Sequence, residues 1–242
     1  MCDTCGCDEP GAVQPHHHGE THTHDVRQPV LDLNQQLAAD NKVLFAEKGI
    51  LCLNLLSSPG SGKTTLLEKL IAKLDGEFKV GVVEGDQQTH FDAARIRKVT
   101  SNVTQVNTNR GCHLDAHMVH HAIGKLDIED LDILFVENVG NLVCPSMFDL
   151  GESKKVVILS VTEGDDKPLK YPNAFFESGL AVISKVDLLP YVDFDIDQCE
   201  DYIRRVNPGM DVLRFSSKSG DGVPELIAWL RKEVAALKVP AV

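Results

Sequence analysis

Residues 57–65 read Ser-Ser-Pro-Gly-Ser-Gly-Lys-Thr-Thr, and this stretch decides the fold. It follows an apolar run at residues 50–56 and precedes a helical pattern at residues 63–74. A glycine-rich turn between a buried strand and a helix is the setting of a phosphate-binding loop, or P-loop. The alternative is an accidental glycine-rich turn, which would not account for the Gly-Lys-Thr-Thr ending in this position. The stretch therefore predicts a domain that binds nucleotide phosphates.

Several residues of this loop have a predicted task. Backbone N–H groups and the positive end of the following helix would hold the β-phosphate. Lys63 would reach the β- and γ-phosphates, and Thr64 would place its hydroxyl on Mg²⁺. Ser57 stands where such loops usually begin with glycine, and a serine fits there if its backbone angles are ordinary. The predicted nucleotide-binding residues of the loop are Gly60, Ser61, Gly62, Lys63, Thr64 and Thr65.

Strand and helix patterns alternate along the rest of the chain. Apolar runs predict strands at residues 50–56, 80–84, 131–137, 156–161 and 180–184. Helical periodicity predicts a first helix from Pro29 to Gly49, and further helices at residues 63–74, 91–99, 114–126, 197–206 and 224–237. Strands that are apolar on both faces belong to a parallel sheet covered by helices. The expected fold is therefore α/β, with a doubly wound, mostly parallel sheet.

Composition excludes two classes of partner. The 242 residues carry a net charge of −12, and an acidic surface repels a nucleic-acid backbone. No apolar run approaches the roughly 20 residues that span a bilayer, and the first residues do not have the pattern of a secretory signal. We therefore expect a cytoplasmic protein that contacts neither nucleic acid nor membrane.

Two strand ends carry carboxylates that could meet Mg²⁺. Asp86 is the last residue of Glu84-Gly-Asp86, directly after the run at residues 80–84. Glu137 begins Glu-Asn-Val-Gly, which resembles the switch pattern D-x-x-G with Glu for Asp. Gly140 could offer its N–H to a γ-phosphate. We predict Lys63, Asp86 and Glu137 as catalytic residues, and Thr64, Asp86 and Glu137 as magnesium ligands. The alternative for both acids is a solvated strand end.

Two later motifs favour guanine over adenine. Ser184-Lys-Val-Asp187 and Ser216-Ser-Lys218 match the guanine-reading N-K-x-D and S-A-K elements of GTPases, with serine in place of the usual Asn at 184. The Asp187 carboxylate can accept N1–H and N2–H₂ of guanine, whereas adenine offers no such pair of donors. The predicted base-side residues are Lys185, Asp187, Ser217 and Lys218. GTP is therefore the expected substrate.

Residues 1–28 differ from the rest, because they hold cysteines and histidines but almost no large apolar side chains. We expect them to form a disordered metal-binding tail, and residues 29–242 to form one P-loop GTPase domain. Cys2, Cys5 and Cys7 place three thiols close together, which suits Ni²⁺ in square-planar or Zn²⁺ in tetrahedral coordination. The histidines of residues 16–24 could store metal or form a solvated linker.

Cys112, His113 and Cys144 are a second candidate metal site. Adjacent residues can share a metal only where the chain turns, and Gly111 together with a helix beginning at Leu114 supplies a turn. Cys144 lies four residues after Gly140, so a loop that senses the γ-phosphate could also move a metal ligand. The alternative is two unrelated core thiols. We expect His117, His120 and His121 to form an exposed helix face, and Cys52 and Cys199 to lie in the core.

Together the motifs resemble one family, the hydrogenase nickel-incorporation GTPases called HypB. The matching stretches begin with MCDTCGC, SSPGSGKTTLLE and EGDQQTHFDAARI, and continue with NRGCHLDAHM, ENVGNLVCP, VTEGDDKPLKYP and SKVDLLPY. The resemblance implies a homodimer when GTP is bound, a HypA-type nickel chaperone as partner, and delivery of nickel to the [NiFe]-hydrogenase large subunit. It also implies a tight nickel site at Cys2, Cys5 and Cys7, and a weaker nickel or zinc site at Cys112, His113 and Cys144.

We expect a slow switch, in which GTP and Mg²⁺ order the loops after Asp86 and Glu137 and alter the second metal site. P-loop GTPases without an arginine finger in place hydrolyse GTP at roughly 10⁻⁴ to 10⁻² s⁻¹, which suits the timing of a transfer. Two rivals stay open. A small-molecule kinase would need an acceptor pocket, and a metal store would depend on the tail histidines rather than on nucleotide.

Overall fold

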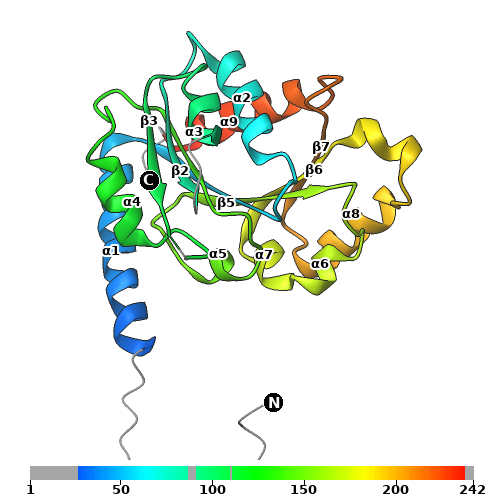
Figure 1. Cartoon of the computed structure of the whole chain (residues 1–242), viewed down its shortest axis with the longest axis horizontal. Coiled ribbons are helices and arrows are strands. Elements are labelled where there is room, and N and C mark those ends of the chain that lie inside the picture. Colours follow the sequence, from blue (N-terminus) through cyan, green and yellow to red (C-terminus); the bar gives the residue numbers. More distant parts are fainter. Residues whose placement is uncertain (1–26, 87–90, 110, 238–242) are drawn as a thin grey trace, which may run out of the picture.

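The computed structural model describes residues 27–86, 91–109 and 111–237, with side chains from Leu33 onward. Its centre is a seven-stranded sheet in the order β3-β2-β4-β1-β5-β6-β7, and each neighbouring pair of strands is parallel (Figure 1). The strands are β1 (Leu51–Ser57), β2 (Val80–Asp86), β3 (Val103–Asn107), β4 (Ile133–Glu137), β5 (Lys154–Ser160), β6 (Ser178–Ser184) and β7 (Asp211–Phe215).

Helices cover both faces of the sheet (Figure 1). In chain order they are α1 (Arg27–Lys48), α2 (Lys63–Leu74), α3 (Phe91–Ile96), α4 (Ala116–Ile123), α5 (Cys144–Met147), α6 (Lys167–Lys170), α7 (Pro172–Phe176), the 3₁₀ helix η1 (Val186–Tyr191), α8 (Ile196–Val206) and α9 (Val223–Leu237). This is the predicted doubly wound α/β fold.

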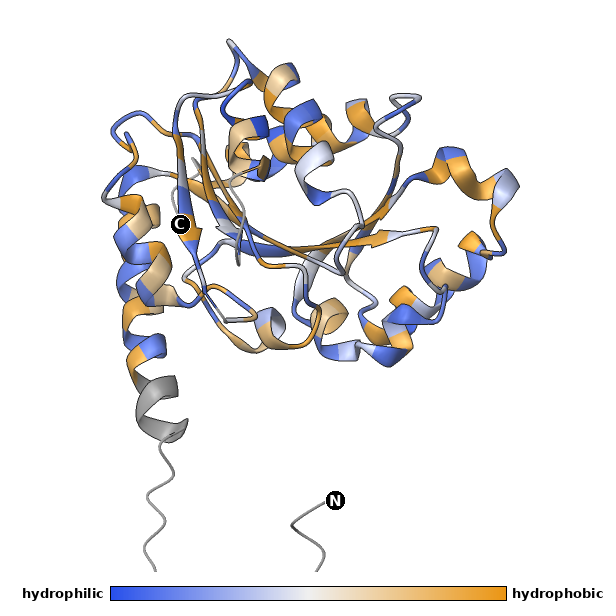
Figure 2. Cartoon of the chain, viewed as in Figure 1, coloured by the Kyte–Doolittle hydropathy of each residue, from blue (hydrophilic) through white to orange (hydrophobic). Residues whose placement is uncertain are grey.

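The alternation of side chains along β1 explains why helices cover both faces. Leu51, Leu53 and Leu55 pack in one cluster with α2 and α9, whereas Cys52 packs with α1 and α4, and Leu56 with α7 and α8. Hydrophobic residues recur along the central strands and the helices around them, as the hydropathy colouring in Figure 2 shows. Because β1 is buried on both sides and lies in the middle of the sheet, the loop after it emerges at the centre of the carboxyl edge.

The predicted element bounds need some corrections. No strand was predicted at residues 103–107, where β3 forms the sheet edge, because this strand is largely polar and only Thr104 is buried. The helix predicted at 114–126 is shorter, since the Asp115 side chain caps its start by accepting from the N–H of Met118 at 2.7 Å. The helix predicted at 91–99 ends at Ile96. Cys52 and Cys199 are buried, as predicted.

Most of the predicted tail lies outside the described residues. Cys2, Cys5, Cys7 and the histidines of residues 16–24 belong to this part, whereas α1 begins at Arg27, two residues before the predicted helix start. Within the described ranges, no helix is both long and apolar enough to cross a membrane.

Candidate functional site

A cavity of about 760 Å³ opens at the carboxyl ends of β1, β2 and β4. The predicted site residues in its wall are Gly60, Ser61, Gly62, Lys63, Thr64, Thr65, Asp86, Cys112, Glu137, Gly140 and Lys185. His113, Cys144, Asp187, Ser217 and Lys218 are not part of this wall. Parallel strands bring their carboxyl ends to one edge, so residues more than 100 positions apart in the sequence meet here.

The P-loop has the conformation that the motif predicts. Ser57 is fully buried at the end of β1. Its backbone angles are ordinary, because the non-glycine residues with positive φ in the described chain are Asn109 and Lys185, and Ser57 is not one of them. Gly62 has φ +95° immediately before α2, a conformation that side chains rarely adopt. The Lys63 ammonium donates to Ser57 Oγ at 2.9 Å, and burial lowers the pKa of Lys63. An incoming phosphate would meet a cation that is already held in place.

Carboxylates gather beside this loop. The Thr64 hydroxyl donates to Glu137 Oε1 at 2.7 Å, whereas the buried Oε2 has no hydrogen-bond partner among the described residues. Burial raises the pKa of Glu137. Burial, followed by repulsion from Glu137 and Asp86, raises the pKa of Glu84 to about 8. A divalent cation would offset this crowding of negative charge, so the donor set of Thr64, Glu137 and Asp86 fits Mg²⁺.

Gly140 lies against the P-loop. A Cβ at this position would stand 3.0 Å from the Cα of Pro59, so even a methyl group would force the two loops apart. The contact brings the backbone after β4 close to the place where the outer phosphate would lie. The predicted role of Gly140, an N–H offered to the γ-phosphate, depends on this close approach, which glycine permits.

Hydrogen bonds hold the two base-side motifs to the P-loop and to each other. Ser184 Oγ donates to the Ser61 carbonyl at 2.7 Å, so the serine that replaces Asn ties β6 directly to the P-loop. Lys185 has φ +60° and its ammonium donates to the Gly60 carbonyl at 2.7 Å. A left-handed lysine is strained, and such strain concentrates at functional sites. Ser216 Oγ donates to Asp187 Oδ1 at 2.5 Å and accepts from the N–H of Lys218, which joins the two motifs.

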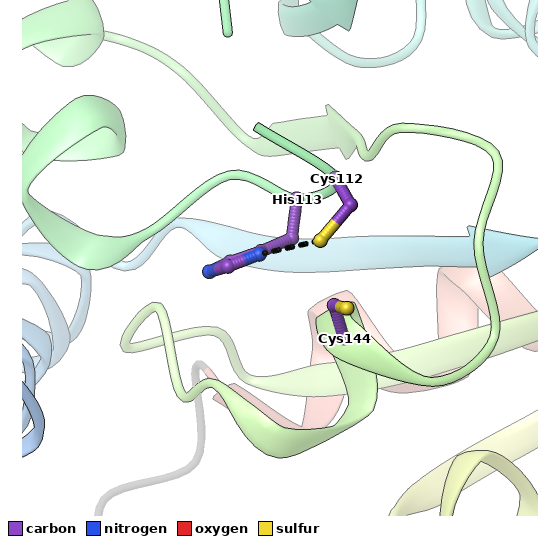
Figure 3. Close-up of side chains that lie close together, drawn as sticks. All are labelled: Cys112, His113 and Cys144. Atoms are coloured by element: carbon purple, nitrogen blue, oxygen red, sulfur yellow. Dashed lines mark hydrogen bonds between the residues drawn. The ribbon is translucent and has the colours of Figure 1, made fainter. Parts of the chain in front are cut away.

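The three residues of the second predicted metal site lie close together in the structure. The ligand atoms of Cys112, His113 and Cys144 all lie within 4.8 Å of one another, and Cys112 Sγ is 3.5 Å from His113 Nδ1 (Figure 3). We call these three residues the Cys-His-Cys triad. The chain turns at Gly111–His113, as sharing a metal requires, and Cys144 comes from the start of α5. All three are half-buried, so Cys112 and Cys144 are not core thiols.

The environment of the triad suits metal binding. The His113 ring stacks on Phe148 with centroids 4.0 Å apart, which orients it. Burial lowers the pKa of His113, which favours the neutral imidazole that binds metals. A hydrogen bond with Cys144, ahead of burial, raises the pKa of the Cys112 thiol. Binding of a soft metal would therefore have to displace a proton from the thiols.

Residues 138–144 connect the cavity to the triad. Asn138 is buried after β4, and its Oδ1 accepts from the N–H of Leu114, two residues beyond Cys112. Asn141 forms a β-bridge with Ser57, and its Nδ2 donates to the Cys112 carbonyl at 3.4 Å. Cys144 ends this segment. A shift of the loop after Glu137 would thus change both the cavity wall and the spacing of the metal ligands.

Several residues at the site had no predicted role of their own. Glu84 and Asn141 line the cavity, and Arg95 lines it while donating to Thr65 Oγ1 at 2.9 Å. Ser216 was quoted only as part of a motif, yet it holds Asp187. Glu84, Arg95 and Asn141 lie inside the stretches EGDQQTHFDAARI and ENVGNLVCP that carry the family resemblance, and this was a usable signal.

Comparisons with known proteins agree on one family. Residues 51–214 match the model "CobW/HypB/UreG, nucleotide-binding domain". The hydrogenase maturation factor HypB of Azotobacter vinelandii is 52% identical over 208 residues, which covers 86% of this chain and 69% of that protein. The Escherichia coli K12 factor of the same name is 49% identical over 229 residues, covering 90% and 79%. The chain belongs to the HypB family.

Solved HypB structures have the same fold. The structure of HypB from Helicobacter pylori in complex with nickel has a TM-score of 0.80 and 38% identity, covering 87% of this chain and 99% of that one. HypB from Archaeoglobus fulgidus has a TM-score of 0.79 and 39% identity, covering 84% and 100%. The family resemblance and the P-loop GTPase fold are thus confirmed. The roles of individual HypB residues in this chain stay predictions, supported by the geometry above.

Replacing Cys144 with serine is expected to weaken Ni²⁺ binding at the triad by at least about tenfold, because it removes a soft ligand. The measurement is a Ni²⁺ titration that follows thiolate-to-metal absorption, in a chain whose Cys2, Cys5 and Cys7 are alanine. Cys199→Ala is the control, since it removes a thiol buried in α8. Equal Ni²⁺ affinity in the Cys144→Ser and control proteins would show that the triad does not bind nickel.

Proposed function

We propose that this chain is a GTP-hydrolysing nickel metallochaperone that helps to insert nickel into the [NiFe]-hydrogenase large subunit. Its GTP state would control dimerisation and metal transfer. One observation carries the proposal: Cys112 belongs both to the wall of the predicted nucleotide cavity and to the Cys-His-Cys triad. The names of the relatives, hydrogenase maturation factors, supply the process in which such a protein would act.

The nucleotide would lie along the carboxyl edge of the sheet. Lys63 and the N–H groups of residues 60–65 would hold the β- and γ-phosphates, with Gly140 on the γ-side. The buried Ser61 hydroxyl, which has no hydrogen-bond partner among the described residues, is available to a phosphate oxygen. The base would lie toward Lys185, Asp187, Ser217 and Lys218. These assignments favour a GTPase over a small-molecule kinase, which would have no use for a guanine-reading carboxylate at Asp187.

Hydrolysis would depend on charge around the γ-phosphate. Thr64, Asp86 and Glu137 would hold Mg²⁺, which would neutralise charge on the phosphates. Lys63 would stabilise the charge that develops as the terminal phosphoryl group leaves. Arg95 is occupied by Glu68 and Thr65, so it is not placed as an arginine finger. We therefore expect slow hydrolysis, on the order of 10⁻⁴ to 10⁻² s⁻¹.

A change from GTP to GDP would alter the metal site through movement of residues 138–144. A γ-phosphate that draws Gly140 inward would pull Asn141, which is tied to Ser57 on one side and to the Cys112 carbonyl on the other. Movement of this segment would alter the distance from Cys144 to Cys112. Hydrolysis would relax the segment and permit release of nickel.

A second copy of the chain would complete the site. The triad supplies three ligands, which leaves room for a ligand from another subunit. Val143 and Met147, on either side of Cys144, are 51% and 65% exposed, and apolar side chains at such a position suit an interface. We further propose a HypA-type chaperone as partner, Cys2, Cys5 and Cys7 as a tight nickel site, Zn²⁺ as an alternative metal for the triad, and a cytoplasmic location.

The test is a Ni²⁺ titration of the variant with alanine at Cys2, Cys5 and Cys7, with GDP and with a non-hydrolysable GTP analogue. The Ni²⁺ affinity of the triad is expected to differ by about 5- to 150-fold between the two nucleotides, the usual range of coupling between sites. Asn141→Ala should reduce this difference, because it removes the contact with Cys112. Identical Ni²⁺ affinity with both nucleotides would refute the proposed coupling.

A further inference from the structure

Helix α1 lies beside α4 and buries two asparagines there (Figure 1). Asn34 is 8% exposed, and Asn41 has no exposed surface. They are separated by two helical turns, so both side chains lie on the same face of α1. A buried amide needs hydrogen-bond partners, and the partners of these two amides lie in residues 112–120 and 149–150.

The triad is built from two parts of the chain that are far apart in the sequence. Residues 112–116 carry Cys112 and His113, and residues 144–151 carry Cys144. We call these two stretches the triad segments. The ligand atoms can share a metal only while the two triad segments keep their present separation. A group that contacts both segments would therefore control the metal site.

Asn34 contacts both triad segments at once. Its Oδ1 accepts from the N–H of Ala116 at 2.9 Å, and its Nδ2 donates to the carbonyl of Asp149 at 2.9 Å. The residue before Asp149 is Phe148, whose ring stacks on His113. One side chain of α1 thus joins the backbone near the histidine ligand to the backbone beside its stacking partner.

Asn41 repeats this arrangement two turns later. Its Nδ2 donates to the carbonyl of Ala116 at 3.1 Å and to the carbonyl of Leu150 at 3.0 Å. Its Oδ1 lies 2.9 Å from Nδ1 of His120, on the exposed face of α4 that the sequence predicted. The N–H and the carbonyl of Ala116 are therefore held by two different asparagines of α1.

The second triad segment also approaches the backbone of α1 closely. Gly151 has φ +85°, and a Cβ at this position would collide with the carbonyl oxygen of Ala38. Apolar packing alone would tolerate some sliding of a helix along its neighbours. Directed hydrogen bonds from buried amides, combined with a contact that only glycine permits, fix one position of α1 against both triad segments.

We propose that α1 is the positioning element of the Cys-His-Cys triad. Asn34 and Asn41 would hold the two triad segments at the separation at which three ligands bind one ion. This inference rests on the metal site of the proposed function, to which it adds the groups that set the site's geometry. Groups that orient metal ligands from outside commonly change metal affinity by about 10- to 100-fold when they are replaced.

The test is a Ni²⁺ titration without nucleotide, in the chain whose Cys2, Cys5 and Cys7 are alanine. Asn34→Leu removes both hydrogen bonds while keeping a side chain of similar size. We expect this variant to bind Ni²⁺ about 10- to 100-fold more weakly, with a changed thiolate-to-nickel absorption spectrum, because the ligands lose their fixed spacing. GTP affinity should be unchanged, since Asn34 is not part of the cavity wall.

Two variants accompany Asn34→Leu. Gln35→Leu makes a similar change at the adjacent, exposed position of α1 and should leave the Ni²⁺ affinity and the spectrum intact. Asn34→Asp has the same size and can still accept from the N–H of Ala116, but its carboxylate cannot donate to the carbonyl of Asp149. It should weaken Ni²⁺ binding as Asn34→Leu does, and it carries the test if the leucine variant does not fold.

The outcomes separate this inference from the proposed function. Normal Ni²⁺ affinity and an unchanged spectrum in both Asn34 variants would overturn the role of α1 and leave the triad site intact. An equal loss of affinity in Gln35→Leu, or a loss of GTP affinity that accompanies the loss of Ni²⁺ binding, would also overturn it, because the effect would then be a general loss of packing. Failure of the background chain itself to bind Ni²⁺ would contradict the metal site, and the inference with it.

Discussion

Replacing Lys63 with alanine is expected to weaken GTP binding by at least about a hundredfold and to remove hydrolysis. The side chain is 9% exposed and lies in the cavity wall, where its ammonium is already held by Ser57. Hydrogen bonds between charged groups contribute about 1.5–3 kcal/mol each, and Lys63 would make them with two phosphates. The measurements are GTP affinity by calorimetry and phosphate release under single-turnover conditions.

Lys69→Ala is the matched control, because Lys69 lies on the same helix but is exposed and outside the cavity wall. It should leave GTP affinity and hydrolysis unchanged. Ni²⁺ binding at Cys112, His113 and Cys144 should survive in both variants when no nucleotide is present, since Lys63 does not contact the triad. GTP affinity that stays normal in Lys63→Ala would contradict the placement of the phosphates.

The sequence predicted which residues meet in the cavity wall where these residues lie at or just after a strand end. Asp86, Glu137 and Lys185 each lie at or directly after the end of an apolar run, and parallel strands bring such ends to one edge of the sheet. The doubly wound fold follows from the same runs. The edge strand β3 was missed because its residues alternate little between apolar and polar, and only pairing with β2 makes it a strand.

Long-range contacts could not be read from the sequence. The link from Asn141 to Cys112 joins residues 29 positions apart, and the link from Ser184 to the P-loop joins residues 123 apart. Sequence motifs identify the residues at each end of such a link, but they do not show that the two residues are in contact. The triad was in doubt for the same reason, since adjacent Cys112 and His113 can share a metal only through a turn that tertiary packing defines. The left-handed backbone of Lys185 is equally a product of the folded site.

Asp187→Asn is expected to lower the preference for GTP over xanthosine triphosphate by at least about a hundredfold. A carboxylate accepts both N1–H and N2–H₂ of guanine, whereas an amide offers one acceptor and one donor, which match N1–H and the 2-oxo group of xanthine. Sites that bind ligand N–H groups reject analogues that lack them by about 10⁴–10⁵-fold, so the expected change is well within reach. Competition of the two triphosphates for a fluorescent GTP analogue measures it.

Two further variants make the Asp187 result specific. Asp193→Asn makes the same chemical change at an exposed carboxylate after η1 and should leave the preference for GTP intact. Ser216→Ala removes the hydroxyl that donates to Asp187 Oδ1, so it should weaken GTP binding without creating affinity for xanthosine triphosphate. The two variants thereby distinguish Ser216, which orients the carboxylate, from Asp187, which would bind the base. If GTP affinity is unchanged in Asp187→Asn, this carboxylate does not bind the guanine base. The proposed position of the base beside Lys185 and Asp187 would then be wrong as well.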